Sequence, residues 1–445
     1  MGSIILGSFD AEKYWRDESL AGLPFIPDIN VDKIVSSMDD LLFPFCGSGD
    51  LLVTLEPFDE VLRQYLESVG FTVNAYGGKI VRPEYCQSGS TKPHSIFTVL
   101  NYKENLEELL KVGEKYSCLL PYAVLPDADK LALNLGLAQS PPCYESVRLV
   151  NSKEYSFNLR NELMDGQFGF IAGSVSDLEK IGLDLLKNGP FLIKDYFGVS
   201  GKGSILIQSD RILKSIAGHL KKQEQAGKTV GFLLEPYLEK DFDFSCGLQI
   251  SREGEIKIVT LQRMLNQGFA FRGIHALEKS HEDELTGSGY FEIMESLGRR
   301  IHKDGYHGYV CIDSMKLKNG RFMPVVEINA RQSMGIINSK ISEHVSNFNM
   351  TSYFTFLPLG FTGEITFSDF FTNLEGAGLL FSARKKEGGI IPLSANTLKL
   401  CLSHNPALKK SRFYFAVIAE NASMFGTIVE NVKSFLKSSG FAVYE

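Results

Sequence analysis

Residues 309–335, YVCIDSMKLKNGRFMPVVEINARQSMG, constrain the fold more than any other part of the chain. Two short apolar runs, residues 309–312 and 322–328, flank a stretch that contains Asn319 and Gly320. An Asn-Gly pair between two apolar runs is typical of a β-hairpin, because glycine and asparagine tolerate the backbone angles of its tight turn. The sequence therefore predicts two antiparallel strands here.

Polar side chains occupy set positions on this predicted hairpin. Asp313 ends the first run, and Glu327 and Asn329 are two residues apart in the second. Side chains two apart on a strand share a face, so we expect these three groups to converge. An oxygen-only set favours a hard cation, above all Mg²⁺, and Arg331 adds a cation on the same face. The alternative is an ordinary edge hairpin with polar side chains.

A glycine-rich loop follows an apolar strand that ends near Lys194. Gly198, Gly201 and Gly203 lie in this loop, together with Lys202. Glycines let backbone N–H groups close around phosphate oxygens, and Lys194 would neutralise part of the phosphate charge. The spacing matches neither a Walker A loop nor the GxGxxG fingerprint, so neither of those nucleotide sites is indicated.

A third element is the apolar strand at residues 231–235, which ends at Glu235. The acids Glu239, Asp241 and Asp243 follow it. The exposed backbone at a strand end can recognise the edge of an adenine, and a nearby acid can hold ribose hydroxyls. For Glu239 and Asp241 we favour the other interpretation, a plain connection between strands.

The order of these motifs resembles the ATP-grasp superfamily, which includes biotin carboxylase, D-alanine–D-alanine ligase and many peptide ligases. The resemblance covers roughly residues 147–335, and its most specific part is the E-x-N-x-R strand, Glu327 to Arg331. It implies an ATP-grasp fold preceded by a parallel-sheet α/β domain, with a small C-terminal α/β or α+β domain that packs near the active site.

The resemblance also implies roles for individual residues. The nucleotide would be bound by Lys153, Lys194, Gly198, Ser200, Gly201, Lys202, Gly203, Glu235, Tyr237, Leu238 and Asp243. Of these, Lys153 and Lys194 would contact the phosphates, Glu235 with Leu238 would form the adenine hinge, and Asp243 would be a ribose or structural acid. Asp313, Glu327 and Asn329 would hold Mg²⁺, with Mn²⁺ as an alternative. Asp313 stands where many relatives carry Glu.

Two residues outside the metal set are candidates for the chemistry. Arg331 is predicted to stabilise the transferring phosphoryl group. Arg272 is predicted to contact an anion, because its planar guanidinium suits carboxylate and phosphate. His275 lies three residues further on, and we favour a structural loop histidine over a catalytic base there.

Composition fits a large enzyme. The chain has 445 residues, 44% of them hydrophobic and 22% charged, enough for about three domains. The predicted domains are residues 1–140, 141–345 and 346–445. The net charge of −7 lacks the excess of positive charge that is typical of proteins that bind nucleic acid. Seven scattered cysteines without a CxxC pair favour a reducing cytoplasm, and no run of ~18 apolar residues suggests a membrane span.

Strands and helices are expected to alternate in the N-terminal region. Segments 50–55 and 71–76 are predicted strands, and segment 57–69 between them is a predicted helix. Segments 95–100, 104–110 and 118–124 continue the alternation, and 127–136 is expected to be helical. In the C-terminal region we expect strands around 363–367, 378–382 and 413–418, and a helix at 425–437.

These observations together predict an ATP-dependent ligase. It would activate the carboxylate of an amino acid or peptide as an acyl-phosphate and join it to an amine, releasing ADP and phosphate. The terminal extensions resemble those of peptide ligases of specialised-metabolite pathways, such as antibiotic biosynthesis. Three alternatives stay open: a carrier-protein thiol as acceptor, a small-molecule kinase, and a nucleotide-binding protein without turnover. A homodimer is also open.

Overall fold

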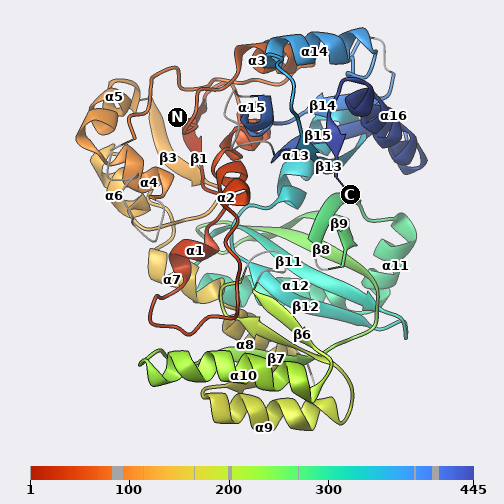
Figure 1. Ribbon diagram of the computed structural model, residues 1–445. Coiled ribbons are helices and arrows are strands. Elements are labelled where there is room, and N and C mark those ends of the chain that lie inside the picture. The colour runs from red at the N-terminus through yellow and green to blue at the C-terminus, as the bar shows by residue number, and fades with distance from the viewer. Residues whose placement is uncertain are drawn as a thin grey trace.

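The computed structural model describes residues 2–82, 94–113, 115–164, 166–198, 203–268, 270–384, 387–402 and 410–444. Within these ranges the strands form three separate sheets (Figure 1). A parallel sheet near the N-terminus and a small antiparallel sheet lie on opposite sides of one large sheet, which runs on into the C-terminal region.

The parallel sheet has the strand order β2-β1-β3 among the described residues, with β1 (Gly2–Leu6) between β2 (Leu51–Leu52) and β3 (Tyr116–Pro121). The apolar end of β1 explains its central place, because Ile4, Ile5 and Leu6 are fully buried. Helices surround the sheet, as expected for parallel strands that are covered on both faces. The predicted parallel-sheet α/β region is therefore confirmed.

The small antiparallel sheet belongs to a separate lobe with its own core. Its described strands run in the order β4 (Phe170–Ala172), β7 (Phe232–Pro236), β5 (Phe191–Asp195) and β6 (Ser204–Ile207). Helices α9 (Val175–Leu186) and α10 (Asp210–Gln225) pack on it, and Ser174 and Ser209 cap their N-termini with side-chain hydrogen bonds. We call this unit the small lobe (bottom of Figure 1).

The large sheet contains nine strands in the described part of the chain. Its main path is β12 (Phe322–Asn329), β11 (Gly308–Leu317), β8 (Lys240–Ile250), β9 (Ile256–Gln267), β10 (Ala270–Ala276), β13 (Thr351–Gly360), β15 (Lys410–Ala419) and β14 (Gly389–Pro392), and β16 (Ala442–Val443) pairs with β13. The predicted hairpin is confirmed as β11–β12, and Gly320 at its turn has a φ of +83°, which favours glycine.

The remaining helices cover these sheets or connect them. They are α1 (Glu12–Trp15), α2 (Ile29–Ser36), the 3₁₀ helix η1 (Asp39–Phe45), α3 (Glu60–Ser68), α4 (Ile96–Leu100), α5 (Lys103–Gly113), α6 (Ala128–Asn134), α7 (Tyr144–Val150), α8 (Lys153–Leu163), α11 (Lys279–Gly287), α12 (Tyr290–Lys303), α13 (Met334–Ser346), α14 (Phe367–Gly376), α15 (Asn396–Leu402), the 3₁₀ helix η3 (Ala422–Met424) and α16 (Phe425–Ser438). The large sheet continues across residue 345, the predicted boundary between the second and third domains, because β13 pairs with β10. The division into three domains stays a prediction.

Three segments predicted as strands are not strands, and segment 95–100 of the expected alternation forms helix α4. Segment 71–76 makes a single bridge between Leu52 and Ala75, because β2 is too short to extend a ladder. Segment 363–367 leads into α14, since the Thr366 side chain caps that helix. Segment 378–382 makes only isolated bridges after the end of α14. The predicted helices at 57–69, 127–136 and 425–437 correspond to α3, α6 and α16.

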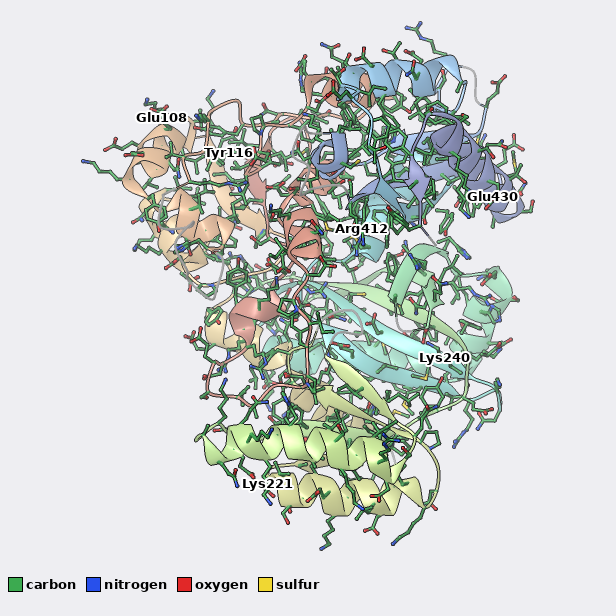
Figure 2. The ribbon with its side chains drawn as sticks, in the orientation of Figure 1. Glu108, Tyr116, Lys221, Lys240, Arg412 and Glu430 are labelled. Carbon is green, nitrogen blue, oxygen red and sulfur yellow. The ribbon has the colours of Figure 1, made fainter. Side chains whose placement is uncertain are left out.

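Charged side chains such as Lys221 on α10 and Glu430 on α16 project from the outer surface (Figure 2). Of the helices that the structure describes, none combines the length and the apolar character needed to cross a bilayer.

Candidate functional site

The β11–β12 hairpin brings the predicted metal ligands together. Asp313 lies directly opposite Glu327, and Cys311 lies opposite Asn329. The amide Nδ2 of Asn329 donates to Oδ2 of Asp313 at 3.2 Å. The structure therefore gathers the three predicted ligand groups on one face of the hairpin.

The two carboxylates of this group repel each other. Burial, and after it the charge of Glu327, raises the pKa of Asp313 to about 7 against the opposing charge of Arg331. A bound cation would relieve this repulsion. Two carboxylates and an amide oxygen are the hard donors that Mg²⁺ prefers. The residues present therefore fit the predicted ion, and their role as ligands stays a prediction.

Lys153 joins this group from a distant part of the chain. It is the first residue of α8, whose N-terminus is capped by Ser152. Its Nζ is paired with Glu327 and donates to the backbone carbonyl of Gly198 at 2.9 Å. The ammonium thus connects the carboxylate pair with the glycine loop, which is where a phosphate-binding lysine is expected.

The two ends of the glycine loop, at Gly198 and Gly203, lie very close together, and we call this close approach the neck of the loop. A Cβ on Gly198 would lie 2.3 Å from the Cα of Gly203, so the two strands can approach only because both residues are glycine. The backbone N–H of Asp195 donates to the carbonyl of Gly203 at 2.8 Å and closes the neck. The predicted nucleotide-binding residues Ser200, Gly201 and Lys202 lie outside the described residues.

The second predicted phosphate lysine lies in the small lobe. Lys194 on β5 is paired with the buried carboxylate of Glu235 on β7, which also pairs with Arg160 of α8. Burial acts to raise the pKa of Glu235, but Lys194 and then Arg160 hold it below its usual value. The side chain of Glu235 is thus committed to two cations, and only its strand-end backbone is left for an adenine.

The predicted hinge follows at the end of β7. The N–H of Tyr237 donates to the carbonyl of Pro190 at 2.9 Å, and the side chains of Tyr237 and Leu238 are partly exposed. Asp243 is paired with Lys240 and accepts from Nδ2 of Asn266 at 2.7 Å. These contacts favour the structural role for Asp243 that was one of its two predicted roles.

Arg331 lies beside the carboxylates but is fully engaged. Its Nε and Nη2 donate to Oε1 of Glu12 at 3.2 and 2.8 Å. Nη1 donates to the hydroxyl of Tyr122 and to the carbonyl of Gln332, each at 3.1 Å, and Nη2 also donates to Asn329 at 3.1 Å. A guanidinium has five N–H groups, so a direct contact with a phosphoryl group requires one of these bonds to be exchanged.

The structure does not bring Arg272 into this group. Its Nη2 is bonded to Gln267 on the neighbouring strand β9, toward the turn between β9 and β10. Three residues on, His275 contacts the carbonyl of Ala276 at 2.8 Å and the ring of Tyr353. A contact of Arg272 with substrate stays a prediction.

Sequence reasoning missed several residues near the site. Glu12 and Arg160 hold Arg331 and Glu235, and buried Gln262 and Gln332 have side-chain atoms without a hydrogen-bond partner among the described residues. Gln262 lies opposite Ser245, which lies opposite Asp313 in turn. Strand register alone places Gln262 there, so no local motif could have found it.

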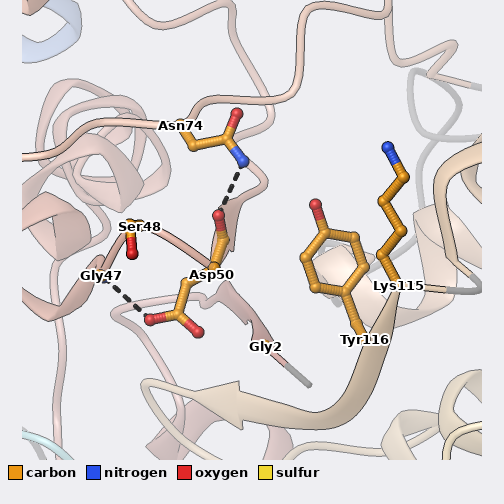
Figure 3. A pocket seen from close by; sticks show the side chains of 8 residues that line it. Gly2, Gly47, Ser48, Asp50, Asn74, Lys115 and Tyr116 are labelled. Atoms are coloured by element: carbon orange, nitrogen blue, oxygen red, sulfur yellow. Dashed lines mark hydrogen bonds between the residues drawn. The ribbon is translucent and has the colours of Figure 1, made fainter.

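A surface hollow of about 720 Å³ lies elsewhere, at the amino ends of the parallel strands (Figure 3). Its acid, Asp50, accepts from the N–H groups of Ser3 and Gly47 at 2.7 and 2.8 Å. Backbone amides therefore already bond both oxygens of this carboxylate, and Lys115 also lines the hollow.

Comparison of the sequence with known proteins gives a partial match. No protein-family model matches the chain. Over 183 residues it is 24% identical to the [butirosin acyl-carrier protein]–L-glutamate ligase of Niallia circulans; the match covers 40% of this chain and 42% of that enzyme.

Solved structures match over nearly the whole chain. A biotin carboxylase from Campylobacter jejuni, in complex with β,γ-ATP, has a TM-score of 0.54 at 12% identity and covers 100% of this chain and 92% of its own. The N5-carboxyaminoimidazole ribonucleotide synthetase of Thermus thermophilus has a TM-score of 0.52 at 13% identity and covers 98% of each chain. The protein therefore has the fold of the ATP-grasp ligases.

Proposed function

We propose that this protein is an ATP-dependent ligase that activates a carboxylate as an acyl-phosphate and joins it to an amine, releasing ADP and phosphate. The observation that carries the proposal is the position of Lys153. Its ammonium contacts both Glu327 of the carboxylate pair and the carbonyl of Gly198 at the neck of the glycine loop. The groups proposed to bind phosphate and those proposed to bind a cation come from separate segments and lie close together, which supports a role in the transfer of a γ-phosphoryl group.

An amino acid is the favoured carboxylate substrate. Gln332 is 1% exposed, and both its amide atoms lack a partner among the described residues; Oε1 of Gln262 is likewise buried and unpartnered. Gln332 directly precedes Ser333, the cap of α13, and a Cβ on Gly335 would lie 3.2 Å from Oε1 of Gln262. Amide donors and a helix N-terminus suit a carboxylate, and an unpartnered amide oxygen suits an ammonium group.

The first step would join the substrate carboxylate to the γ-phosphorus. One carboxylate oxygen attacks phosphorus, the bond from the γ-phosphorus to the β,γ-bridging oxygen breaks, and ADP leaves. Lys153 would stabilise the negative charge on the phosphates, as would Lys194 after exchanging its bond to Glu235. Mg²⁺, held by Asp313, Glu327 and Asn329, would supply further neutralisation of that charge.

The second step would transfer the acyl group. The nitrogen of the acceptor amine attacks the carbonyl carbon, phosphate leaves with the bonding electrons, and the amine gives up a proton. A carrier protein is the second candidate acceptor, because the matched Niallia circulans enzyme is named for ligating glutamate to an acyl-carrier protein. In that case a thiol sulfur would attack in place of the amine nitrogen.

The test is nucleotide and phosphate release with a panel of amino acids, alone and with amines or a thiol acceptor. A ligase releases ADP and phosphate together only with acid and acceptor present. With acid alone, ATP labelled with oxygen-18 at the β,γ bridge should scramble its label, because the acyl-phosphate forms reversibly and the freed β-phosphate of ADP rotates.

Three outcomes would contradict the proposal. ADP without phosphate, with a phosphorylated product, identifies a kinase, and stoichiometric AMP identifies adenylation of the acid. Binding of ATP without turnover across the whole panel identifies a nucleotide-binding protein.

A further inference from the structure

The short helix α1 lies between two parts of the candidate site. Trp15, the single tryptophan of the chain, is 1% exposed and its indole N–H donates to the carbonyl of Val124 at 3.0 Å. The carbonyl of Trp15 accepts from Nε of Arg148 at 2.7 Å. These bonds fix the helix in place. Glu12 and Arg16 are one turn apart and reach in different directions from it.

Glu12 holds Arg331. Its Oε1 accepts two of the five N–H bonds of that guanidinium, and both side chains are largely buried. Oε2 of Glu12 is buried without a hydrogen-bond partner among the described residues, so the carboxylate is directed at Arg331 through one oxygen. Little solvent screens such a pair, and its loss would remove two of the five hydrogen bonds that orient the guanidinium.

Arg16 holds the neck of the glycine loop. Its Nε and Nη2 donate to Oδ2 of Asp195, each at 3.1 Å. Asp195 in turn accepts from the N–H of Phe197 at 3.1 Å and donates its own N–H to Gly203 at 2.8 Å. Asp195 therefore links Arg16 to both sides of the loop, through its carboxylate on one side and its backbone N–H on the other. Arg148, which also contacts Trp15, lies over the ring of Phe197.

The segment after α1 continues into the small lobe (Figure 1). The N–H of Ala21 donates to the carbonyl of Thr229 at 2.8 Å, and the N–H of Thr229 donates to Ser19 at 2.9 Å. Gly22 exchanges two hydrogen bonds with the side chain of Gln223 on α10, at 3.0 and 2.8 Å. Hydrogen bonds thus attach the segment that follows α1 to the small lobe.

We propose that Glu12 and Arg16 are positioning residues for phosphoryl transfer. Glu12 orients Arg331 at the acyl end of the site, and Arg16 sets the glycine-loop neck at the phosphate end through Asp195. Glu12 begins α1 and Arg16 directly follows its last residue as the C-cap, so this one turn holds the two ends of the site at a fixed separation. The inference rests on the proposed ligase function, and neither residue need touch substrate.

Kinetics separate the two roles. Glu12→Gln should lower kcat about ten- to a hundredfold with the KM for ATP little changed, the scale of a lost orienting contact. Arg16→Met should mainly raise the KM for ATP, and Arg16→Lys should restore part of it. Arg63→Met is the matched control, because Arg63 pairs with Glu60 and Glu67 on the exposed face of α3.

A double variant tests whether Glu12 acts through Arg331. In an Arg331→Ala background, Glu12→Gln should cause no further loss of kcat, because the group it orients is gone. Full additivity of the two losses would overturn the role of Glu12, and so would a Glu12→Gln enzyme with unchanged kcat. A parallel fall in thermal stability and activity for all variants, without a split between kcat and KM, would indicate a structural role only and overturn the proposal.

Nucleotide binding gives a readout that does not need turnover. Addition of ADP with Mg²⁺ should change the fluorescence of Trp15 in the natural protein and in Arg63→Met, because the neck and α1 are joined through Arg16. The change should be lost in Arg16→Met at saturating ADP. A full fluorescence change in Arg16→Met would overturn the coupling. If the natural protein turns over no acid, the ligase proposal fails while this binding experiment still decides the coupling.

Discussion

Two clusters of charged side chains in this protein have opposite balances of positive and negative charge. In the small lobe, the single carboxylate of Glu235 lies between the cations Lys194 and Arg160, and its pKa is held below the usual value. On the β11–β12 hairpin, two carboxylates face each other, and burial with the charge of Glu327 raises the pKa of Asp313 to about 7.

In the small lobe the carboxylate is already neutralised by protein side chains, whereas on the hairpin a bound cation would be needed to balance the carboxylates. Glu235 has both oxygens paired, so it stabilises the lobe and holds Lys194 in place. Asp313 and Glu327 together carry more negative charge than Lys153 can neutralise, which leaves an unbalanced site for a cation. Substitutions in the two clusters should therefore have different, and in one measurement opposite, effects.

The largest effect is expected at the hairpin. Glu327→Gln keeps the shape of the side chain but removes the charge that would face a cation and that pairs with Lys153. We expect turnover to fall about a hundred- to a thousandfold, the scale of a lost electrostatic contact in a transition state. ADP release at a series of Mg²⁺ concentrations measures it, with thermal melting to confirm the fold.

The matched control for this substitution is Glu343→Gln on the exposed side of α13, which should have near-normal turnover. The turnover of Asn329→Ala should fall as well, as it does for Glu327→Gln. Near-normal activity in both hairpin variants would remove the cation site from the proposal.

The second effect concerns the small lobe. Glu235→Gln leaves Lys194 and Arg160 buried without their counter-ion, and breaking one side of a buried pair costs about 3–5 kcal/mol. We expect an early unfolding transition for the lobe in a denaturant titration. Glu60→Gln, which removes an exposed partner of Arg63, should change the free energy of unfolding by less than about 1 kcal/mol. Equal stability of the Glu235 and Glu60 variants would contradict the comparison.

A third substitution should act with the opposite sign. Asp313→Asn removes one of two facing carboxylates, so in the presence of a chelator it should raise the free energy of unfolding by about 1–2 kcal/mol. The same variant should lose turnover and should no longer be stabilised by Mg²⁺. A chelated Asp313→Asn protein that is less stable than the natural one would show that the carboxylates do not repel.

The hairpin and its acids could be predicted from the sequence because a turn and a spacing of two residues are local features. Lys153 was found only through the resemblance, since its contact with Glu327 joins distant segments. Glu12 and Gln262 carried no signal at all: one reaches Arg331 across the fold, and the other is placed by the register of three strands. The wrong strands failed for a related reason. Segment 71–76 has the composition of a strand, but its partner β2 is too short to form a ladder.

The smallest effect comes from a third kind of acid, one bonded to backbone amides instead of a cation side chain. Asp39 on η1 accepts from the N–H of Leu55 at 2.5 Å, and burial raises its pKa to about 8. An unfolded Asp loses its proton near pH 4, so the folded state binds more protons between about pH 4 and 8 and stability falls as pH rises through that window.

Asp39→Asn cannot ionise in either state and its amide oxygen can still accept from Leu55. It should therefore melt at a temperature close to that of the natural protein near pH 4 and about 2–4 °C higher at pH 8. Melting curves across this range measure the difference; Asp32→Asn, which removes an exposed partner of Lys13, should show no comparable slope. A difference that shrinks toward pH 8 would mean that the carboxyl of Asp39 is ionised and compensated, as Glu235 is.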